Sequence, residues 1–286
     1  MSLIETKKTF YINSGNRLSG TNSRFTVNIP ILSTDDFDHV ALLQATIPKS
    51  FYQVRTSLNT FTLTEGITSV TITVPRGNYS RRSLQAIVED LLTNNSPNGI
   101  VYQISWPSSS ETQTGKYTFT CSDVGGIQPS FTFTNGMYKQ LGFEKNTSYQ
   151  FSSFQLTSEN VIDLQPDALL YIHSDICSNS NSNDDILQEI YVAAGTPDYS
   201  NIHWENYDLE AYSKTLVSKN KTTYTFYITD EDGIEVNLNG VHVNLTLVFY
   251  KKNPYYDMMK NYIKYILYKE DLEKGQNISQ TSQNNV

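Results

Sequence analysis

The sequence is poor in charged side chains and nearly lacks cysteine. Only 17% of its 286 residues are charged, against about 25% in ordinary soluble domains. Its two cysteines, Cys121 and Cys177, are too few for a disulfide framework and do not have the spacing of a zinc site. The net charge is −8 and no basic stripe is present, which argues against nucleic acid as the main partner.

Long apolar runs are missing as well. No stretch approaches the length of about 18 apolar residues that a membrane span requires. The opening segment MSLIETKKTFYINS has no apolar core of the kind found in signal peptides. We therefore expect neither a membrane span nor secretion.

The motifs that carry chemistry are also absent. The four histidines never occur in a pair with the i+2 or i+4 spacing of metal ligands, and there is no HExxH. Neither a GxSxG elbow, a reactive-cysteine motif nor a GxGxxG loop occurs. We therefore predict no catalytic residue, no cofactor-binding residue and no metal ligand, and we expect that the protein is not an enzyme. The histidines are His39, His173, His203 and His242, of which His173 and His242 fall in predicted strands as structural residues.

Two adjacent acidic residues are candidates for calcium ligands. Asp184 and Asp185 close an Asn-rich loop over residues 178–185, which we expect to be mobile. Carboxylates of this kind can hold calcium, but the loop lacks the ligand spacing of a calcium-binding loop. The prediction of no metal site therefore stands.

Ser, Thr and Asn are abundant instead, and so is tyrosine. The three polar types make up 86 residues, and Tyr (20) outnumbers Phe (13). Side chains that are polar without charge, β-branched or aromatic are typical of turns and strands rather than helices. The composition therefore predicts an all-β protein.

Alternating apolar residues locate the strands. Phe25, Val27, Ile29 and Ile31 lie on one face of their segment, and residues 40–47 are apolar on both faces, as in a central strand. Eight strands of one sandwich are expected, the number in a jelly roll. They lie at 25–31, 40–47, 149–156, 168–173, 187–192, 209–216, 223–228 and 241–250.

The segment 57–146 has a different pattern. A hairpin is predicted around Gly66, and then a helix that begins after Ser80 and whose apolar positions recur at i, i+3, i+4 and i+7. Three short strands and a helical turn follow. We expect an α+β domain inserted at 57–146 into a jelly roll made of 1–56 and 147–253. The alternative is that residues 61–74 pair with the sandwich strands and no separate domain exists.

The C-terminal segment 254–274 is predicted to be a helix. Apolar side chains from Tyr255 to Leu267 form one stripe at helical spacing, with lysines beside it. This helix could dock on its own domain or on a neighbouring subunit, whereas its acidic residues disfavour a membrane surface. Residues 251–274 carry a net charge of +2 on a chain that is otherwise −10. The tail 275–286 should be disordered.

A few side chains have two interpretations. Arg81 and Arg82 stand at the start of the predicted helix, where they oppose its dipole. They are either tolerated surface charges or contacts for an acidic partner. Tyr102, Trp106 and Trp204 are either core and subunit contacts or aromatic platforms for sugars.

Several segments, taken in order, resemble the penton (vertex) proteins of virophages and polinton-like viruses, the mavirus type most of all. They run from about residue 8 to residue 250, while residues 178–222 match nothing in that family. The segments are FYINS at 10–14 with Arg17, Gly20 and Ser23-Arg24-Phe25; VALL at 40–43 and ATIPKSFY at 45–52; ITVP at 72–75 with Gly77 and Tyr79; LGF at 141–143; and Asp232-Gly233, Val236 and LNGV at 238–241 leading into 245–250.

The resemblance implies a fold and a function. It implies a minor capsid protein built on a single jelly roll, five copies of which close a ring at each fivefold vertex of an icosahedral virion. Trimers of a major capsid protein would surround the ring, the insertion would point outward toward a possible host receptor, and assembly would occur in the host cytoplasm. The alternative function is a receptor- or glycan-binding jelly-roll module of a viral fibre or surface protein.

Overall fold

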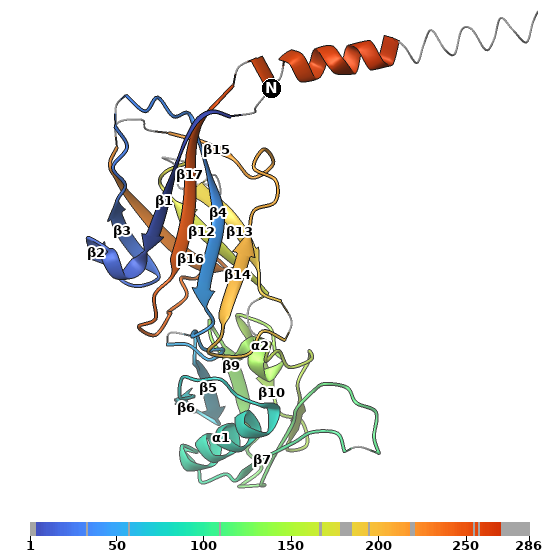
Figure 1. Ribbon diagram of the computed structural model, residues 1–286. Helices are drawn as coiled ribbons and strands as arrows, with labels where there is room; N and C mark the ends of the chain where they lie inside the picture. Colours follow the sequence, from blue (N-terminus) through green and yellow to red (C-terminus); the bar gives the residue numbers. More distant parts are fainter. Residues whose placement is uncertain are drawn as a thin grey trace, which may run out of the picture. The chain divides into compact units, whose positions relative to one another are not determined.

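The computed structural model divides into two compact units (Figure 1). Unit 1 comprises Met1–Ser50 and Leu169–Val286, and unit 2, Phe51–Ala168, is inserted between them. The predicted insertion, 57–146, was therefore too short at both ends. The structure describes residues 4–32, 34–56, 58–108, 110–165, 168–177, 185–193, 195–217, 221–253, 255–256 and 258–269.

Unit 1 consists of two antiparallel sheets. One has the strand order β1-β17-β4-β14, with β15 also paired with β4, and the other has the order β13-β12-β16-β3-β2. The strands are β1 (Ile4–Asn13), β2 (Ser19–Gly20), β3 (Arg24–Asn28), β4 (His39–Pro48), β12 (Leu169–Ser174), β13 (Ile186–Tyr191), β14 (Asn201–Glu205), β15 (Lys214–Thr215), β16 (Thr223–Asp230) and β17 (Asn244–Lys252).

The order of the eight principal strands is that of a jelly roll. Counted along the chain without the short β2 and β15, the first sheet holds strands one, eight, three and six. The second sheet holds strands five, four, seven and two. Strands from opposite ends of the chain thus lie next to each other, as two Greek keys require. The expected all-β jelly-roll sandwich is confirmed.

Two of the eight predicted strands were wrong. Residues 149–156 belong to unit 2, and 209–216 is mainly a loop that ends in β15. The strands that take their places are β1 and β14. In β1 the adjacent Lys7 and Lys8 interrupt the apolar alternation, and β14 has only five residues. Neither strand therefore has a strong period-two signal.

The core of unit 1 lies between the two sheets. Inward side chains of both sheets line it, and several are aromatic. Within the second sheet the rings of Phe25 and Phe226 stack at 5.7 Å, and across the core Tyr224 lies 6.5 Å from Phe249 of the first sheet. Such ring contacts stabilise a core beyond the area that they bury. The buried apolar side chains on these strands include Val40, Leu42, Ile47, Leu170, Ile172, Ile228, Leu245 and Leu247.

Unit 2 has two small sheets and a helix. β5 pairs with β6 and with β9, not with any strand of unit 1, so the inserted α+β domain is confirmed. The sheets have the orders β10-β9-β5-β6 and β11-β8-β7. The elements are β5 (Thr60–Glu65), β6 (Thr68–Thr73), α1 (Arg81–Asn94), β7 (Tyr102–Ser105), β8 (Thr118–Cys121), β9 (Ser130–Phe133), α2 (Tyr138–Leu141), β10 (Thr147–Gln150) and β11 (Gln155–Thr157).

Helix α1 begins and packs as its sequence predicts. Ser80 Oγ accepts from the amide of Ser83 at 3.2 Å, while Ser83 Oγ accepts from the amide of Ser80 at 2.9 Å. This reciprocal cap satisfies two amides at the start of the helix. The helix then buries Leu84, Val88 and Leu92 in the core of unit 2.

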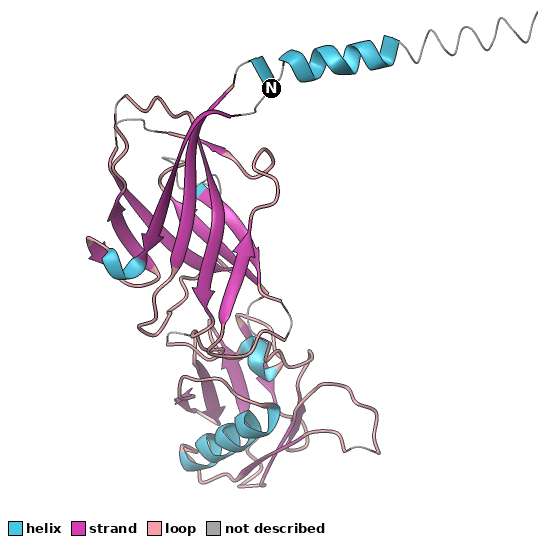
Figure 2. Ribbon diagram, in the orientation of Figure 1, coloured by secondary structure: helices cyan, strands magenta, loops and turns pink. Residues whose placement is uncertain are grey.

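A further helix follows β17 at the C-terminal end (Figure 2). The chain is helical at 255–256 and at 258–269. The other positions of the predicted helix 254–274, and the predicted tail 275–286, lie outside the described residues. No described helix has the length and apolar character to cross a membrane.

Candidate interaction surfaces

Exposed tyrosines occur on unit 1 and not on unit 2. The six tyrosines of unit 2 are all described, and each is buried or partly buried. On the sandwich of unit 1, five tyrosines are exposed, and Tyr207 reaches 91%. Tyrosine is enriched in protein interfaces because its ring is apolar and its hydroxyl can stay hydrated. The exposed set comprises Tyr11, Tyr191, Tyr199, Tyr207 and Tyr212.

One loop combines exposed tyrosines with acidic groups. We call residues 205–212 the acidic loop; its exposed side chains include Glu205, Tyr207, Asp208, Glu210 and Tyr212. It begins at Glu205, the last residue of β14, in a region of the sequence, 178–222, for which the family resemblance gave no guidance. Sequence reasoning missed it because part of it had been assigned to a strand.

The acidic loop is held against the first sheet of unit 1. The Asn206 amide nitrogen donates to the carbonyl of Leu43 at 2.8 Å, and its Nδ2 donates to the carbonyl of Leu42 at 2.9 Å. Leu209 packs against a small buried cluster of Ala41, Val248 and Tyr250 on the outer face of that sheet. The loop therefore presents its exposed side chains from a fixed backbone.

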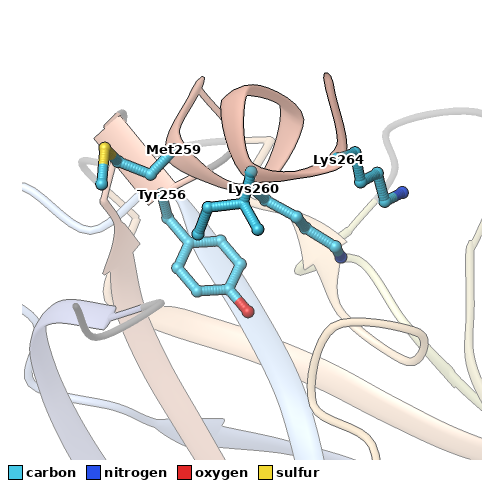
Figure 3. A pocket seen from close by; sticks show the side chains of 5 residues that line it. Tyr256, Met259, Lys260 and Lys264 are labelled. Carbon is cyan, nitrogen blue, oxygen red and sulfur yellow. The ribbon is translucent and has the colours of Figure 1, made fainter. Parts of the chain in front are cut away.

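The C-terminal helix exposes an apolar stripe. Its members include Met259, Tyr262, Ile263 and Ile266, whose exposed fractions run from 37% to 59%. A groove of about 330 Å³ lies along this helix, and Figure 3 shows the side chains that line it. The groove is lined by Tyr256, Met259, Lys260, Ile263 and Lys264, so apolar and cationic side chains share it.

One ion pair links the helix to the acidic loop. Lys260 Nζ lies 3.2 Å from Glu210 Oε2, and both side chains are about 40% exposed. An exposed pair of this kind contributes at most about 1 kcal/mol. It does show that the two segments have complementary charge.

The outer face of the second sheet carries a stack of polar rings. The Arg24 guanidinium lies 3.9 Å from the ring centroid of Tyr227, which itself stacks on His173 at 4.4 Å. The Tyr227 hydroxyl donates to Asp185, and burial together with this carboxylate raises the pKa of Tyr227 to about 12. Asp185 is thus engaged by the protein, which leaves it poorly placed to act as a calcium ligand.

His173 contacts Asp185 with one ring nitrogen and Thr229 with the other. A catalytic triad places its acid, histidine and hydroxyl in the same order. His173 Nδ1 lies 2.9 Å from Asp185 Oδ1, and its Nε2 lies 3.0 Å from Thr229 Oγ1. Thr229 is only 4% exposed, however, and its hydroxyl donates to the carbonyl of Asp230 at 3.1 Å. A nucleophile must be free to reach a substrate, so this arrangement has the contacts of a structural network.

The other histidines have separate local partners. His39 lies 2.7 Å from Asp38, His203 lies 3.2 Å from Thr46, and the exposed His242 lies 3.3 Å from Ser14. His242 precedes β17 instead of lying in it, because β17 begins at Asn244. Within the described residues, no three acidic, His or Cys side chains are grouped as metal ligands.

The two cysteines are free thiols. Burial raises the pKa of Cys121 and of Cys177 to about 11. A thiol with so high a pKa is almost entirely protonated at neutral pH and is a weak nucleophile.

The three aromatic residues considered for sugar binding differ in exposure. Tyr102 is buried, with its hydroxyl donating to Glu65 at 2.7 Å, so the sugar-platform interpretation is wrong for it. Trp106 is partly buried beneath the Arg81 guanidinium, 4.2 Å from the ring centroid. This contact gives Arg81 a partner in its own chain. Trp204 on β14 stays partly exposed, and Tyr212 meets its ring edge-on at 6.1 Å.

Comparison with known proteins gives similarity in structure but none in sequence. No family model and no curated protein sequence matches the chain. Among solved structures, the mavirus penton protein is similar over 85% of this chain and 98% of that chain, with 12% sequence identity and a TM-score of 0.45. A match at this identity and TM-score does not establish membership of a family.

Proposed function

We propose that this protein is a structural capsid protein that forms homopentameric pentons at the fivefold vertices of an icosahedral virion. Trimers of a major capsid protein surround each penton, and the protein is located in the virion after assembly in the host cytoplasm. The family resemblance in the sequence suggested this function. The single jelly roll that the resemblance implied is present in unit 1.

The observation that carries the proposal is the uneven distribution of exposed tyrosines. A ring of identical copies uses a head-to-tail contact, so each copy needs two different surfaces that fit each other. Unit 1 has exposed tyrosines on both of its sheets, for example Tyr11 on β1 and Tyr191 on β13. Low charge limits the cost of bringing such surfaces together.

The surface of unit 2 is suited to contact with solvent rather than with another subunit. Its exposed large apolar side chains are few, namely Ile67, Val101 and Val161 among the described residues. We assign to it the outward projection from the vertex, where it is free to meet a host receptor. The insertion between β4 and β12 leaves the sandwich strands free to form the ring contacts.

Sedimentation of the purified full chain tests the proposal. We expect a species of five times the 32.5 kDa chain mass, formed on concentration or on mixing with the major capsid protein. A stable trimer under all conditions would contradict it and favour a fibre protein. A glycan array with strong binders that are lost in Trp204→Ala would favour the sugar-binding alternative.

A further inference from the structure

The C-terminal helix needs a surface that its own sandwich does not supply. Most of the stability of a helix in a protein comes from packing of its apolar face. Large side chains from one end of the helix's described part to the other, including Tyr262 and Leu267, are more than half exposed. An apolar stripe of this kind on a soluble protein marks a binding site.

The charged residues of the helix indicate what kind of surface its apolar stripe binds. The segment 255–269 carries three lysines and one acidic residue. Residues 175–210 carry eight acidic residues and neither Lys nor Arg, and the acidic loop contributes Glu205, Asp208 and Glu210 to this set. The cationic helix and the acidic loop are therefore complementary surfaces of one chain.

The contact within one chain leaves most of this complementarity unused. Among the described lysines of the helix, Lys260 alone forms an ion pair with the acidic loop, through Glu210. Among the described residues, Lys264 and Lys269 form no ion pair, and at a rise of 1.5 Å per residue they lie about 6 and 13 Å further along the helix axis. On the loop, Tyr207 is 91% exposed beside Glu205 and Asp208.

We propose that the C-terminal helix docks on the acidic loop of a second copy of this chain. The groove of the helix accepts the Tyr207 ring among Met259 and Ile263, while Lys260 and Lys264 at the same groove pair with the acidic side chains of that loop. Two such helices packed on each other would bring lysine against lysine, which is unfavourable. The proposal extends the proposed self-assembly and identifies one of its contacts.

Charge reversal in two separate chains tests this docking. One chain carries Lys260→Glu and Lys264→Glu, and the other carries Glu205→Lys and Glu210→Lys. Each alone should associate about tenfold more weakly than the wild type, since several exposed charge pairs become repulsive. An equimolar mixture should recover most of the association measured by sedimentation. The matched control, Arg82→Glu with Asp90→Lys on exposed positions of α1, should change nothing.

If the helix docks on a different surface, these experiments give different results. If the helix docks on its own loop, a chain with all four reversals recovers but the mixture of two chains does not, and the proposal is overturned. Binding of the wild-type chain to anionic phospholipid vesicles, lost in the helix variant while self-association is unchanged, overturns it in favour of a lipid surface. A chain that ends at residue 253 provides a third test. If it forms five-copy assemblies at the same concentration as the wild type, the docking proposal is overturned and the proposed penton function is left intact.

Discussion

The two units differ in where they place their aromatic side chains. Unit 2 packs its rings inward: Phe119, Phe131 and Phe143 are all fully or almost fully buried and touch one another. Unit 1 also has an aromatic core, but its sandwich exposes five further tyrosines, and its C-terminal helix exposes others. One chain with one composition thus contains a self-sufficient unit and a unit whose surface resembles that of an interface.

Charge follows the same division. Unit 2 holds 7 basic and 9 acidic residues and is nearly neutral, whereas unit 1 has most of the net negative charge. Within unit 1 the charge is separated further, with an acidic segment at 175–210 and a basic one at 251–274. Separated charges of opposite sign favour specific association of copies, so we expect the contacts of the proposed assembly on unit 1.

The largest predicted effect is a loss of stability that is confined to unit 2. Glu65 is 1% exposed and accepts from the Tyr102 hydroxyl at 2.7 Å, from Ser96 Oγ at 2.8 Å and from the Asn98 amide at 2.9 Å. Glu65→Ala leaves the buried Tyr102 hydroxyl and two neighbouring donors without their acceptor, which should lower the stability of unit 2 by about 3 kcal/mol. Thermal unfolding followed by calorimetry should show one transition shifted down.

The control for this variant is Asp90→Asn on the exposed side of α1, which should leave both transitions in place. If Glu65→Ala shifts unit 1 and unit 2 together, the two units unfold as one cooperative body. The comparison between them would then hold for their surfaces but not for their stability.

The second prediction tests the surface difference. Tyr11→Thr with Tyr191→Thr removes two exposed rings from unit 1 and keeps β-forming side chains on β1 and β13. Self-association should weaken by about tenfold to thirtyfold, as expected when interface tyrosines are lost. The matched pair on unit 2, Ile67→Thr with Val101→Thr, should leave the dissociation constant unchanged. Equal losses in both pairs, measured by sedimentation equilibrium, would place the ring contacts on both units.

The sequence predicted best what depends on neighbouring residues. The α1 helix, with its Ser80 cap and its stripe from Leu84 to Leu92, is confirmed because its periodicity and its cap are local features. The hairpin around Gly66 is confirmed for the same reason, since this glycine has a φ of 61°, which other residues rarely adopt. The all-β class followed from composition alone.

What the sequence could not predict depends on residues far apart in the chain. β1 is a strand because it pairs with β17, more than 230 positions away, and its own Lys7-Lys8 pair obscures the alternation. The acidic loop becomes a surface only because Leu209 and Asn206 are held by β4 and β17. The interior position of Tyr102 depends on Glu65, which no local pattern identifies.

The smallest predicted effect concerns Asp38, the residue before β4 in unit 1. Burial by itself would raise the pKa of its carboxyl, but hydrogen bonds from His39 and from the Lys252 amide outweigh it and hold the pKa below its ordinary value of 3.8. A lowered pKa in the folded state means that the carboxylate contributes stability above that ordinary value and that the contribution disappears as the pH falls below it. Asp38→Asn should therefore destabilise unit 1 at neutral pH by less than about 1 kcal/mol, because the side chain is 35% exposed.

The pH dependence of this loss separates its electrostatic cause from a packing change. Urea unfolding of the wild type and of Asp38→Asn should differ at pH 7, and the difference should shrink steadily as the pH is lowered below 3.8, because the carboxyl is protonated in the unfolded chain first and in the folded chain at lower pH. A difference that keeps the same size as the pH falls would show that the substitution disturbs packing at the end of β17 instead. The transition of unit 2 should stay unchanged throughout, because the groups that hold Asp38 are all in unit 1.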